Sequence, residues 1–457
     1  MSDLEVIIMA AGLGTRMKSR TVKVLHRAAG RPLIDYVVDL ACAMCDVPPV
    51  VVVGHQREAV QRHLGGRVRF AVQEQQLGTG HAVMQAIDAV GNAREVLILS
   101  GDVPLTRPET LRRLVEEHRR AGNALTMLTM ILDDPAMYGR IVRDASGGVE
   151  KIVEAKDAND EQRKIREVNA GVYLFDGEHL VANLRKLSNK NAQGEYYLTD
   201  LIALLRANGH RVGALVIRDP IEVLGVNSRA ELATVEGEIQ RRVVEKLMAE
   251  GVTFRNPSTV VIDSTVTIGN DTVVYPYVTL EGQTRIGSAC VIEPGVHLHN
   301  VEVGNDVHLK TGTVAEDAII EDEATVGPYA HLRPGTKLGQ HVKIGNFVET
   351  KKAVFGAGAK ASHLSYIGDA DVGSDVNIGA GTITCNYDGV HKHKTVLEDG
   401  VFIGSDTQLV APVRVGRGAY VGAGSTITKD VPPDALALSR VPQKVVEGWA
   451  RRKRQKR

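Results

Sequence analysis

The chain has 457 residues, and its 55 Lys and Arg residues equal its 55 Asp and Glu residues, so the formal net charge is zero. This length predicts two or three domains, and the balanced charge argues against a general attraction to nucleic acid or anionic membranes. The first residues lack the charged and apolar regions of a signal peptide, and no apolar run is long enough to span a bilayer. We therefore expect a soluble cytoplasmic protein.

Four cysteines fit a reducing compartment. Cys42 and Cys45 form a C-x-x-C inside an apolar segment that is predicted to be helical, without a second pair nearby. A structural zinc site needs more ligands, so buried thiols are the better interpretation.

The first half of the chain alternates apolar runs with helical patterns. The runs that read as buried strands cover residues 5–9, 50–53, 68–72 and 96–100. Strands that alternate with helices are typical of a mostly parallel α/β sheet, in which ligands bind beyond the carboxyl ends of the strands. The Gly-rich turn at 10–17 and the pair Gly101-Asp102 each follow a strand, so both are predicted to lie at that edge.

The Gly-rich turn reads Gly12-Leu13-Gly14-Thr15-Arg16. It lacks the third glycine of a dinucleotide-binding turn, where Met17 stands, and the Gly-Lys-Ser/Thr of a Walker A loop. Its glycines would let backbone N–H groups approach a phosphate, to which Arg16 and Lys23 would add positive charge. Taken alone, the loop is read equally well as a tight turn.

A helical linker is predicted over residues 228–250, after a first domain at 1–227. Ser228 and Glu231 have the spacing of a capping box. Five apolar residues then follow at helical spacing: Leu232, Val235, Ile239, Val243 and Leu247. Gly251 would end the helix and open the last domain, 251–457.

From Ile268 to Ile427 a small apolar residue returns at every sixth position in three runs. These are Ile268, Val274, Leu280, Ile286, Ile292 and Leu298, then Val326, Leu332, Leu338 and Ile344, then Leu397, Ile403, Leu409, Val415, Val421 and Ile427. A period of six is neither helical nor that of one long strand. It predicts a β-solenoid of short strands and tight turns, in which glycine supplies unusual φ angles. An insertion at 385–396 breaks the pattern, and such loops commonly carry function.

The hexads resemble the hexapeptide-repeat family, whose members form left-handed parallel β-helices that are usually trimers. In the first half, the turn at 10–17 with Lys23-Val24-Leu25 resembles the signature of sugar-phosphate nucleotidyltransferases. Further motifs of that pattern fall in the expected order at residues 76–82, 101–105, 138–140, 153–154, 168–169 and 225–227. Together they resemble the bacterial family of bifunctional N-acetylglucosamine-1-phosphate uridyltransferases and glucosamine-1-phosphate N-acetyltransferases over nearly the whole chain.

The resemblance implies that the first domain transfers UMP from UTP to N-acetylglucosamine 1-phosphate, with Mg²⁺ held by Asp102 and Asn227. Lys23 and Arg16 would stabilise the pyrophosphate charge. The implied contacts with UDP-N-acetylglucosamine are Met9, Ala10, Ala11, Gly12, Lys23, Gln73, Gly78, Thr79, Gly139, Glu154, Asn169 and Asn227. Three residues depart from the family pattern and leave the fine sugar contacts open: Val22, Ser100 and Ala170.

In the solenoid the resemblance implies acetylation of glucosamine 1-phosphate by acetyl-CoA. His363 would be the general base, since a base for this step must titrate near neutrality, with Glu349 to orient its ring. The implied contacts with the sugar phosphate are Arg333, Lys351, Tyr366, Asn377 and Lys392. Those with acetyl-CoA are Ala380, Asn386, Tyr387, Ser405, Ala423 and Arg440. Cys385 lies beside these residues, so a thiol reagent is predicted to inhibit this half.

The implied whole is a homotrimer that makes UDP-N-acetylglucosamine for peptidoglycan and lipopolysaccharide synthesis. Two alternatives are a nucleotidyltransferase whose solenoid is only a scaffold, and a non-enzymatic regulatory subunit. The pairs His297/His299 and His391/His393 are read as lacking nearby acidic or thiol partners, and they are therefore interpreted as surface residues rather than metal ligands. The basic end 451–457 is read as a disordered tail, or as a contact for the CoA phosphates with Trp449 near the adenine.

Overall fold

The computed structural model describes residues 3–455. The chain forms two compact units that divide within helix α8 (Arg229–Ala249), between Ile239 and Gln240, and each unit is described by itself. Helix α8 is the helix predicted over 228–250. Within residues 3–455, none of the helices has the length and apolar character needed to cross a membrane.

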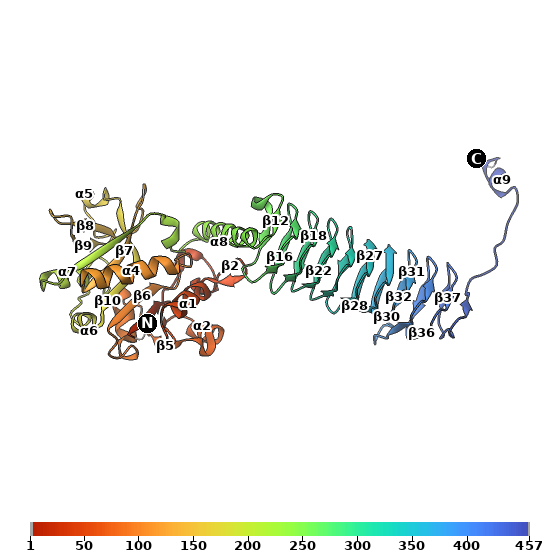
Figure 1. Ribbon diagram of the computed structural model, residues 1–457, viewed down its shortest axis with the longest axis horizontal. Helices are drawn as coiled ribbons and strands as arrows, with labels where there is room; N and C mark the ends of the chain where they lie inside the picture. The colour runs from red at the N-terminus through yellow and green to blue at the C-terminus, as the bar shows by residue number, and fades with distance from the viewer. Residues whose placement is uncertain (1–2, 456–457) are drawn as a thin grey trace. The chain divides into compact units, whose positions relative to one another are not determined.

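The first unit is built on one sheet with strand order β11-β7-β10-β6-β1-β4-β5 (Figure 1). Its neighbours are parallel except at β10, which runs antiparallel to both β6 and β7. The mostly parallel sheet predicted from the sequence is therefore confirmed. The strands are β1 (Leu4–Met9), β4 (Val50–Val53), β5 (Arg69–Val72), β6 (Glu95–Ser100), β7 (Leu125–Ile131), β10 (Glu167–Asp176) and β11 (Val212–Ile217).

Smaller elements flank this sheet. The antiparallel pair β8 (Arg140–Arg143) and β9 (Val149–Val153) is attached to β10. A two-residue pair, β2 (Arg27–Ala28) and β3 (Arg31–Pro32), precedes α1. The short 3₁₀ turns are η1 (Thr15–Met17), η2 (Lys23–Leu25), η3 (Gly65–Arg67), η4 (Ile87–Ala89) and η5 (Pro220–Val223).

Helices cover both faces of the sheet because alternate strand residues point to opposite sides. Val6 and Ile8 of β1 join a core with α1, α2 and α4, whereas Ile7 joins a second core with α3, α6 and α7. The unit is therefore a three-layer α/β/α domain. Its helices are α1 (Leu33–Met44), α2 (Arg57–Leu64), α3 (Thr79–Ala86), α4 (Pro108–Ala121), α5 (Asp160–Arg163), α6 (Gly177–Leu184) and α7 (Asp200–Ala207).

The second unit is a left-handed parallel β-helix of hexapeptide repeats, seen as a stack of coils in Figure 1. It has three faces, on each of which every strand pairs in parallel with its counterpart in the next coil. The first face holds β12 (Thr253–Phe254), β15 (Val273–Val274), β18 (Val291–Ile292), β21 (His308–Leu309), β24 (Thr325–Val326), β27 (Lys343–Asn346), β29 (Lys360–His363), β31 (Asn377–Ile378), β34 (Phe402–Ile403), β37 (Tyr420–Val421) and β39 (Leu436–Ala437).

The other two faces share the bent strands β28 (Glu349–Phe355) and β30 (Tyr366–Val372). One also holds β13 (Val261–Ile262), β16 (Thr279–Glu281), β19 (His297–His299), β22 (Val314–Glu316), β25 (His331–Leu332), β32 (Ile383–Cys385), β35 (Gln408–Val410) and β38 (Thr426–Ile427). The other holds β14 (Thr267–Ile268), β17 (Arg285–Ile286), β20 (Glu302–Val303), β23 (Ile319–Ile320), β26 (Lys337–Leu338), β33 (Thr395–Leu397) and β36 (Val413–Val415). The turn η6 (Pro257–Thr259) precedes the first coils, and α9 (Trp449–Gln455) follows the last.

The register explains both the hexads and their slips. Val273 pairs with Val291, a step of three hexads, but Val291 pairs with His308, one residue fewer. The sequence pattern slips wherever a coil loses that residue. Between Asn377 and Phe402 the step grows to 25 residues, which accommodates the predicted loop at 385–396. The apolar hexad residues are buried along the axis and form one continuous core.

The expectation that glycine supplies unusual φ angles at the turns is confirmed in part. Gly295 and Gly312 have positive φ angles. The hexad glycines that directly follow an apolar residue, such as Gly269 and Gly345, do not, and other corner positions with positive φ belong to residues such as Asp271. The hexad glycines are instead needed for close approach, because a Cβ on Gly345 would lie 1.9 Å from the carbonyl oxygen of Ser362 in the next coil. Stacked backbones leave no room there for a side chain.

Candidate active sites

The carboxyl ends of β1 and β6 form the floor of the site in the first unit. These strands are neighbours, with Met9 opposite Ser100, so the Gly-rich loop and Asp102 leave the sheet side by side. Gly101 donates its N–H to the Met9 carbonyl oxygen at 2.9 Å. The prediction that both segments share one edge is therefore confirmed by the register.

A cleft of about 430 Å³ opens over this edge. Most of the predicted nucleotide contacts line it: Met9, Ala11, Gly12, Arg16, Lys23, Gln73, Gly78, Thr79, Asp102 and Asn227. Residues that sequence reasoning missed line it too: Leu13, Val24, Gln76, Ala82 and Glu195. Ala10 is not among the lining residues, since its small side chain is buried against the core and its N–H bonds to the Val52 carbonyl oxygen.

Lys23, Asp102 and Asn227 meet inside this cleft. The Lys23 ammonium makes an ion pair with Asp102 and donates to Asn227 Oδ1 at 3.0 Å. Backbone hydrogen bonds hold the two acceptor residues, Asp102 and Asn227, in place. The Val226 N–H donates to the Asp102 carbonyl oxygen, and the Asn227 N–H donates to Glu231 Oε2. A carboxylate and an amide oxygen thus converge on one cation at the head of the cleft.

The far wall of the cleft holds Gln73 and Gly78. The Gln73 amide is almost fully buried and donates to the Gly78 carbonyl oxygen at 3.1 Å. Gly78 has φ +101°, and a Cβ there would lie 2.6 Å from the Tyr196 carbonyl oxygen. This turn requires glycine for both reasons, and it presents buried amide groups of the kind that can read a base edge.

Of the predicted sugar contacts, Glu154 lines a second cleft of about 410 Å³, whereas Gly139 and Asn169 are not among its lining residues. Thr15 and Arg16 line both clefts, so the two adjoin. A Cβ on Gly139 would lie 3.4 Å from Glu154 Oε2, and Asn169 N–H donates to the Gly139 carbonyl oxygen, which brings the three residues together. Burial raises the pKa of Glu154, although a hydrogen bond from Thr199 opposes that shift.

In the β-helix, four predicted residues lie at one corner in successive coils: His363, Ala380, Ser405 and Ala423. Asp406 N–H donates to the Ala380 carbonyl oxygen, and Gly424 N–H donates to that of Ser405. Arg440 extends the row by donating to the Ala423 carbonyl oxygen at 2.8 Å. The structure therefore brings four of the six residues expected to contact acetyl-CoA, Ala380, Ser405, Ala423 and Arg440, into one line along the coils that starts at His363.

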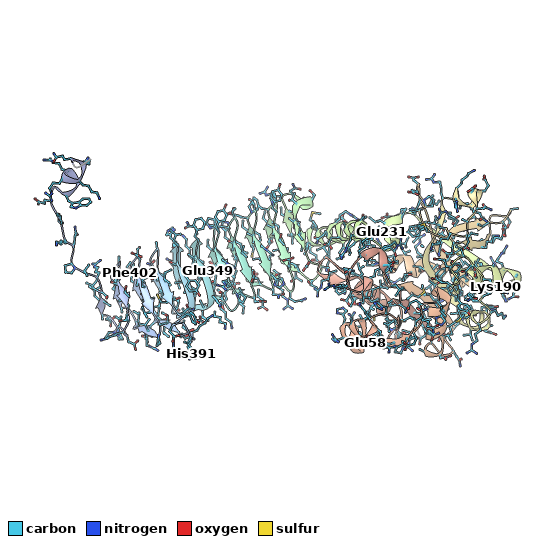
Figure 2. All side chains as sticks on the ribbon, turned by 180° about the vertical axis from the view of Figure 1, so that it is seen from behind. Glu58, Lys190, Glu231, Glu349, His391 and Phe402 are labelled. Atoms are coloured by element: carbon cyan, nitrogen blue, oxygen red, sulfur yellow. The ribbon has the colours of Figure 1, made fainter. Side chains whose placement is uncertain are left out.

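His363 ends β29 and is exposed, and its Nδ1 forms a 2.7 Å hydrogen bond with Asn346 Oδ1 one coil earlier. The expectation that Glu349 orients this ring is wrong, because Glu349 pairs with Arg333 at 2.7 Å. Figure 2 labels Glu349 on the coils. With Nδ1 donating to the Asn346 amide oxygen, the free lone pair of the neutral ring is on Nε2. Asn346 could have been found from its offset of 17 residues from His363, which is one coil.

Three cations gather where the inserted loop returns to the β-helix. The pKa of Lys351 is lowered by its contact with Lys392 and by that residue's charge, with a further contribution from Arg333. Lys392 is held there because it bridges to Tyr387 across the loop. Like charges kept close together indicate a site for an anion such as a phosphate.

The remaining predicted residues are placed less tightly. The Asn386 amide lies 3.5 Å from the Tyr366 hydroxyl and also bonds Asp369. Asn377 lies on the first face of the β-helix, away from the face that carries Tyr366. Tyr387 is exposed, with its hydroxyl on the Gly389 carbonyl oxygen.

Two further expectations need correction. The reason given for dismissing the histidine pairs is wrong, because Glu281 lies 2.7 Å from His297 and Asp388 lies 2.7 Å from His393. Figure 2 labels His391, the other member of the second pair, at the edge of the coils. Even so, within residues 3–455 there is no group of three His, Cys, Asp or Glu side chains that could hold a metal ion.

Part of the basic end is helical, as α9, rather than disordered, and the last two residues, 456 and 457, lie outside the described part.

Known proteins match both units. A family model described as "Nucleotidyl transferase" covers residues 5–220, and one described as "Bacterial transferase hexapeptide (six repeats)" covers residues 317–352 and 394–429. Three proteins, each called "Bifunctional protein GlmU", resemble the chain along its whole length. Those from Geotalea uraniireducens and Trichlorobacter lovleyi are 50% and 51% identical, and each alignment covers 99% of this chain and 100% and 99% of the relative. That from Heliobacterium modesticaldum is 51% identical over 99% of both chains.

Fold and sites together define a two-activity transferase, with a nucleotidyltransferase domain followed by a hexapeptide-repeat acyltransferase domain. At this identity over the full length, the chain belongs to the GlmU family of bifunctional proteins. It is a uridyltransferase and an acetyltransferase, so the scaffold and regulatory-subunit alternatives are set aside.

Proposed function

We propose that the β-helix acetylates glucosamine 1-phosphate and that the α/β unit then converts the product and UTP to UDP-N-acetylglucosamine and pyrophosphate. The cleft that joins the Gly-rich loop to Asp102 and Asn227 carries the second step. The corner row that starts at His363 carries the first. The product would feed peptidoglycan and lipopolysaccharide synthesis in the cytoplasm.

In the α/β unit the sugar phosphate oxygen attacks the α-phosphate of UTP. Catalysis of this kind is mainly positioning and neutralisation of charge. Arg16 and the Gly-rich loop face the phosphates, while Gln73 and Gly78 bind the uracil and Gly139, Glu154 and Asn169 bind the sugar. Lys23 and Arg16 stabilise the leaving pyrophosphate.

The residues at the head of the cleft fit Mg²⁺. Asp102 and Asn227 offer hard oxygen donors, and in the structure both already accept from the ammonium of Lys23. When bound there, the metal neutralises phosphate charge and orients the triphosphate.

In the β-helix, His363 Nε2 takes a proton from the substrate amine as it attacks the thioester. Asn346 keeps the ring in the required tautomer. Arg333, Lys351 and Lys392 hold the sugar phosphate, with Tyr366 on the sugar. Asn377 lies on another face of the β-helix and would reach the sugar bound to a neighbouring subunit of the homotrimer. Ala380, Asn386, Tyr387, Ser405, Ala423 and Arg440 line the path of acetyl-CoA.

A homotrimer is part of this proposal. Tyr329, Phe347 and Leu364 occupy the same corner in consecutive coils, and all three are exposed. The Tyr329 and Phe347 rings stack at 5.7 Å. A ladder of exposed apolar side chains on a rigid unit is typical of a subunit contact. Analytical ultracentrifugation should give a trimer that Phe347→Glu weakens, and a monomeric wild type would contradict this part.

The two activities can be tested in one reaction with glucosamine 1-phosphate, acetyl-CoA, UTP and Mg²⁺, followed by mass spectrometry. Wild type should make UDP-N-acetylglucosamine. Asp102→Ala should accumulate N-acetylglucosamine 1-phosphate, and His363→Ala should form product only when that intermediate is supplied. If both variants behave as wild type, the assignment of the two sites is wrong.

A further inference from the structure

Lys23 stands in an unexpected place for a residue that contacts pyrophosphate. Its ammonium lies between Asp102 and Asn227 Oδ1, the two groups to which the proposed function gives the divalent cation. The Lys23 and Asp102 side chains are only 13% and 16% exposed, so water and salt screen this pair weakly. One positive charge already occupies the position between the metal-binding oxygens.

The side chain of Lys23 is anchored at its base and free to move at its end. Gly14, at φ +60°, packs on the stem, since a Cβ on Gly14 would lie 2.8 Å from Lys23 Cβ. The acceptors are tied to the backbone of 225–227 and to Glu231, as described above. Of the groups at this point, the ammonium is therefore the one that can leave by rotation about its side-chain bonds alone.

We propose that Lys23 holds the cation position in the nucleotide-free enzyme and yields it by exchange, so that the metal enters together with UTP. A divalent cation alone must break the charge-assisted hydrogen bonds of Lys23 without offering the ammonium a new partner. A cation that arrives with a triphosphate offers one, because the ammonium turns from the carboxylate to the phosphate oxygens. The exchange rests on the proposed metal-binding role of Asp102 and Asn227, and it adds an order of binding to it.

Binding of Mn²⁺ alone tests the exchange without any assay of activity. Mn²⁺ takes the same oxygen ligands as Mg²⁺, and the free ion can be counted by electron paramagnetic resonance. Lys23→Met should bind Mn²⁺ at least about tenfold more tightly than wild type, which is the lower end of what a hydrogen bond to a charged group contributes. Arg16→Met is the matched control. It removes a positive charge from the same cleft but touches neither Asp102 nor Asn227 among the described contacts.

The control separates displacement from simple charge removal. If Arg16→Met gains as much affinity as Lys23→Met, or if Lys23→Met gains none, the exchange is wrong. Asp102→Asn should lose Mn²⁺ binding in either case. If Asp102→Asn binds Mn²⁺ like wild type, the metal assignment itself fails.

A second measurement needs no variant. In wild type, the rate at which an amine-reactive reagent modifies Lys23 can be followed by peptide mass spectrometry, with the exposed Lys337 as an internal reference. At a Mn²⁺ concentration at which electron paramagnetic resonance shows the ion bound to wild type, and without nucleotide, the rate at Lys23 should rise relative to that at Lys337, because the bound ion releases the ammonium. An unchanged or lower relative rate would overturn the exchange.

Discussion

The hydrogen bond between Asn346 and His363 Nδ1, 2.7 Å long, offers a sharp test of the acetyl-transfer site. When His363 accepts the proton of the substrate amine, the ring becomes a cation and this bond strengthens. A hydrogen bond to a charged group contributes about 1.5–3 kcal/mol, which corresponds to about 10- to 100-fold in rate. Asn346→Ala should therefore lower kcat for acetylation by about that factor, with a smaller effect on KM.

The assay follows release of CoA thiol, and uridyl transfer on the same sample is the control for folding. Asn346→Asp keeps an acceptor at the same place and should retain more activity than Asn346→Ala. Its carboxylate favours the protonated ring, so the acid limb of the pH profile should move to higher pH. A loss of less than about threefold in Asn346→Ala would refute the positioning role, since it is well below what a hydrogen bond to a charged group contributes.

Three other predictions concern stability and reactivity. Gly345→Ala should lower the free energy of unfolding of the β-helix by about 3 kcal/mol, because its Cβ would lie 1.9 Å from the Ser362 carbonyl oxygen. Gly237→Ala, which has open space around it, is the control and should leave the thermal midpoint unchanged or raise it. Equal effects of the two substitutions would contradict the close-approach argument. Burial raises the pKa of Glu154, so the folded state binds its proton more tightly than the unfolded chain, and stability falls as pH rises from the unfolded value of 4.5 through the folded value. Glu154→Gln should thus raise the calorimetric midpoint at pH 7 but not below about pH 4, and an unchanged midpoint at pH 7 would count against it. Burial also raises the pKa of the Cys385 thiol, so alkylation should be slow at neutral pH, faster at higher pH, and should impair acetylation but not uridyl transfer; full acetylation after complete alkylation would end this prediction.

The β-helix was predictable because each hexad residue reports directly on the axis of the coils. Ile268, Leu298 and Ile427 are all buried where the period of six places them. The identity of the polar partners was less predictable, because it depends on the register between coils. Asn346 and Glu349 are both polar and close in sequence to the start of β28, and only the pairing of Asn346 with His363 decides between them.

In the α/β unit, the sequence located Asp102 at the end of a strand but could not indicate what its carboxylate contacts. The pairing with Lys23 joins positions 79 residues apart, and Asn227 lies a further 125 residues along the chain. Such contacts arise from tertiary packing rather than from local pattern. For the same reason Glu195, which lines the cleft from a separate loop, carried no sequence signal, and the motif at 76–82 did not indicate that Gln76 lines the cleft.

The corner row in the β-helix has a consequence for how long a ligand can be. Strands in neighbouring coils lie about 4.8 Å apart, so the three steps from His363 to Ala423 measure about 14 Å along the axis. The spacing along the row is therefore set by the backbone of the coils and not by side chains. Removing one whole coil between Ala380 and Ala423 would shorten the row by one inter-coil distance and leave His363 in place. An acyl donor long enough to contact the whole row would then no longer match its contacts, whereas a shorter thioester that reaches only the first coil would still be used.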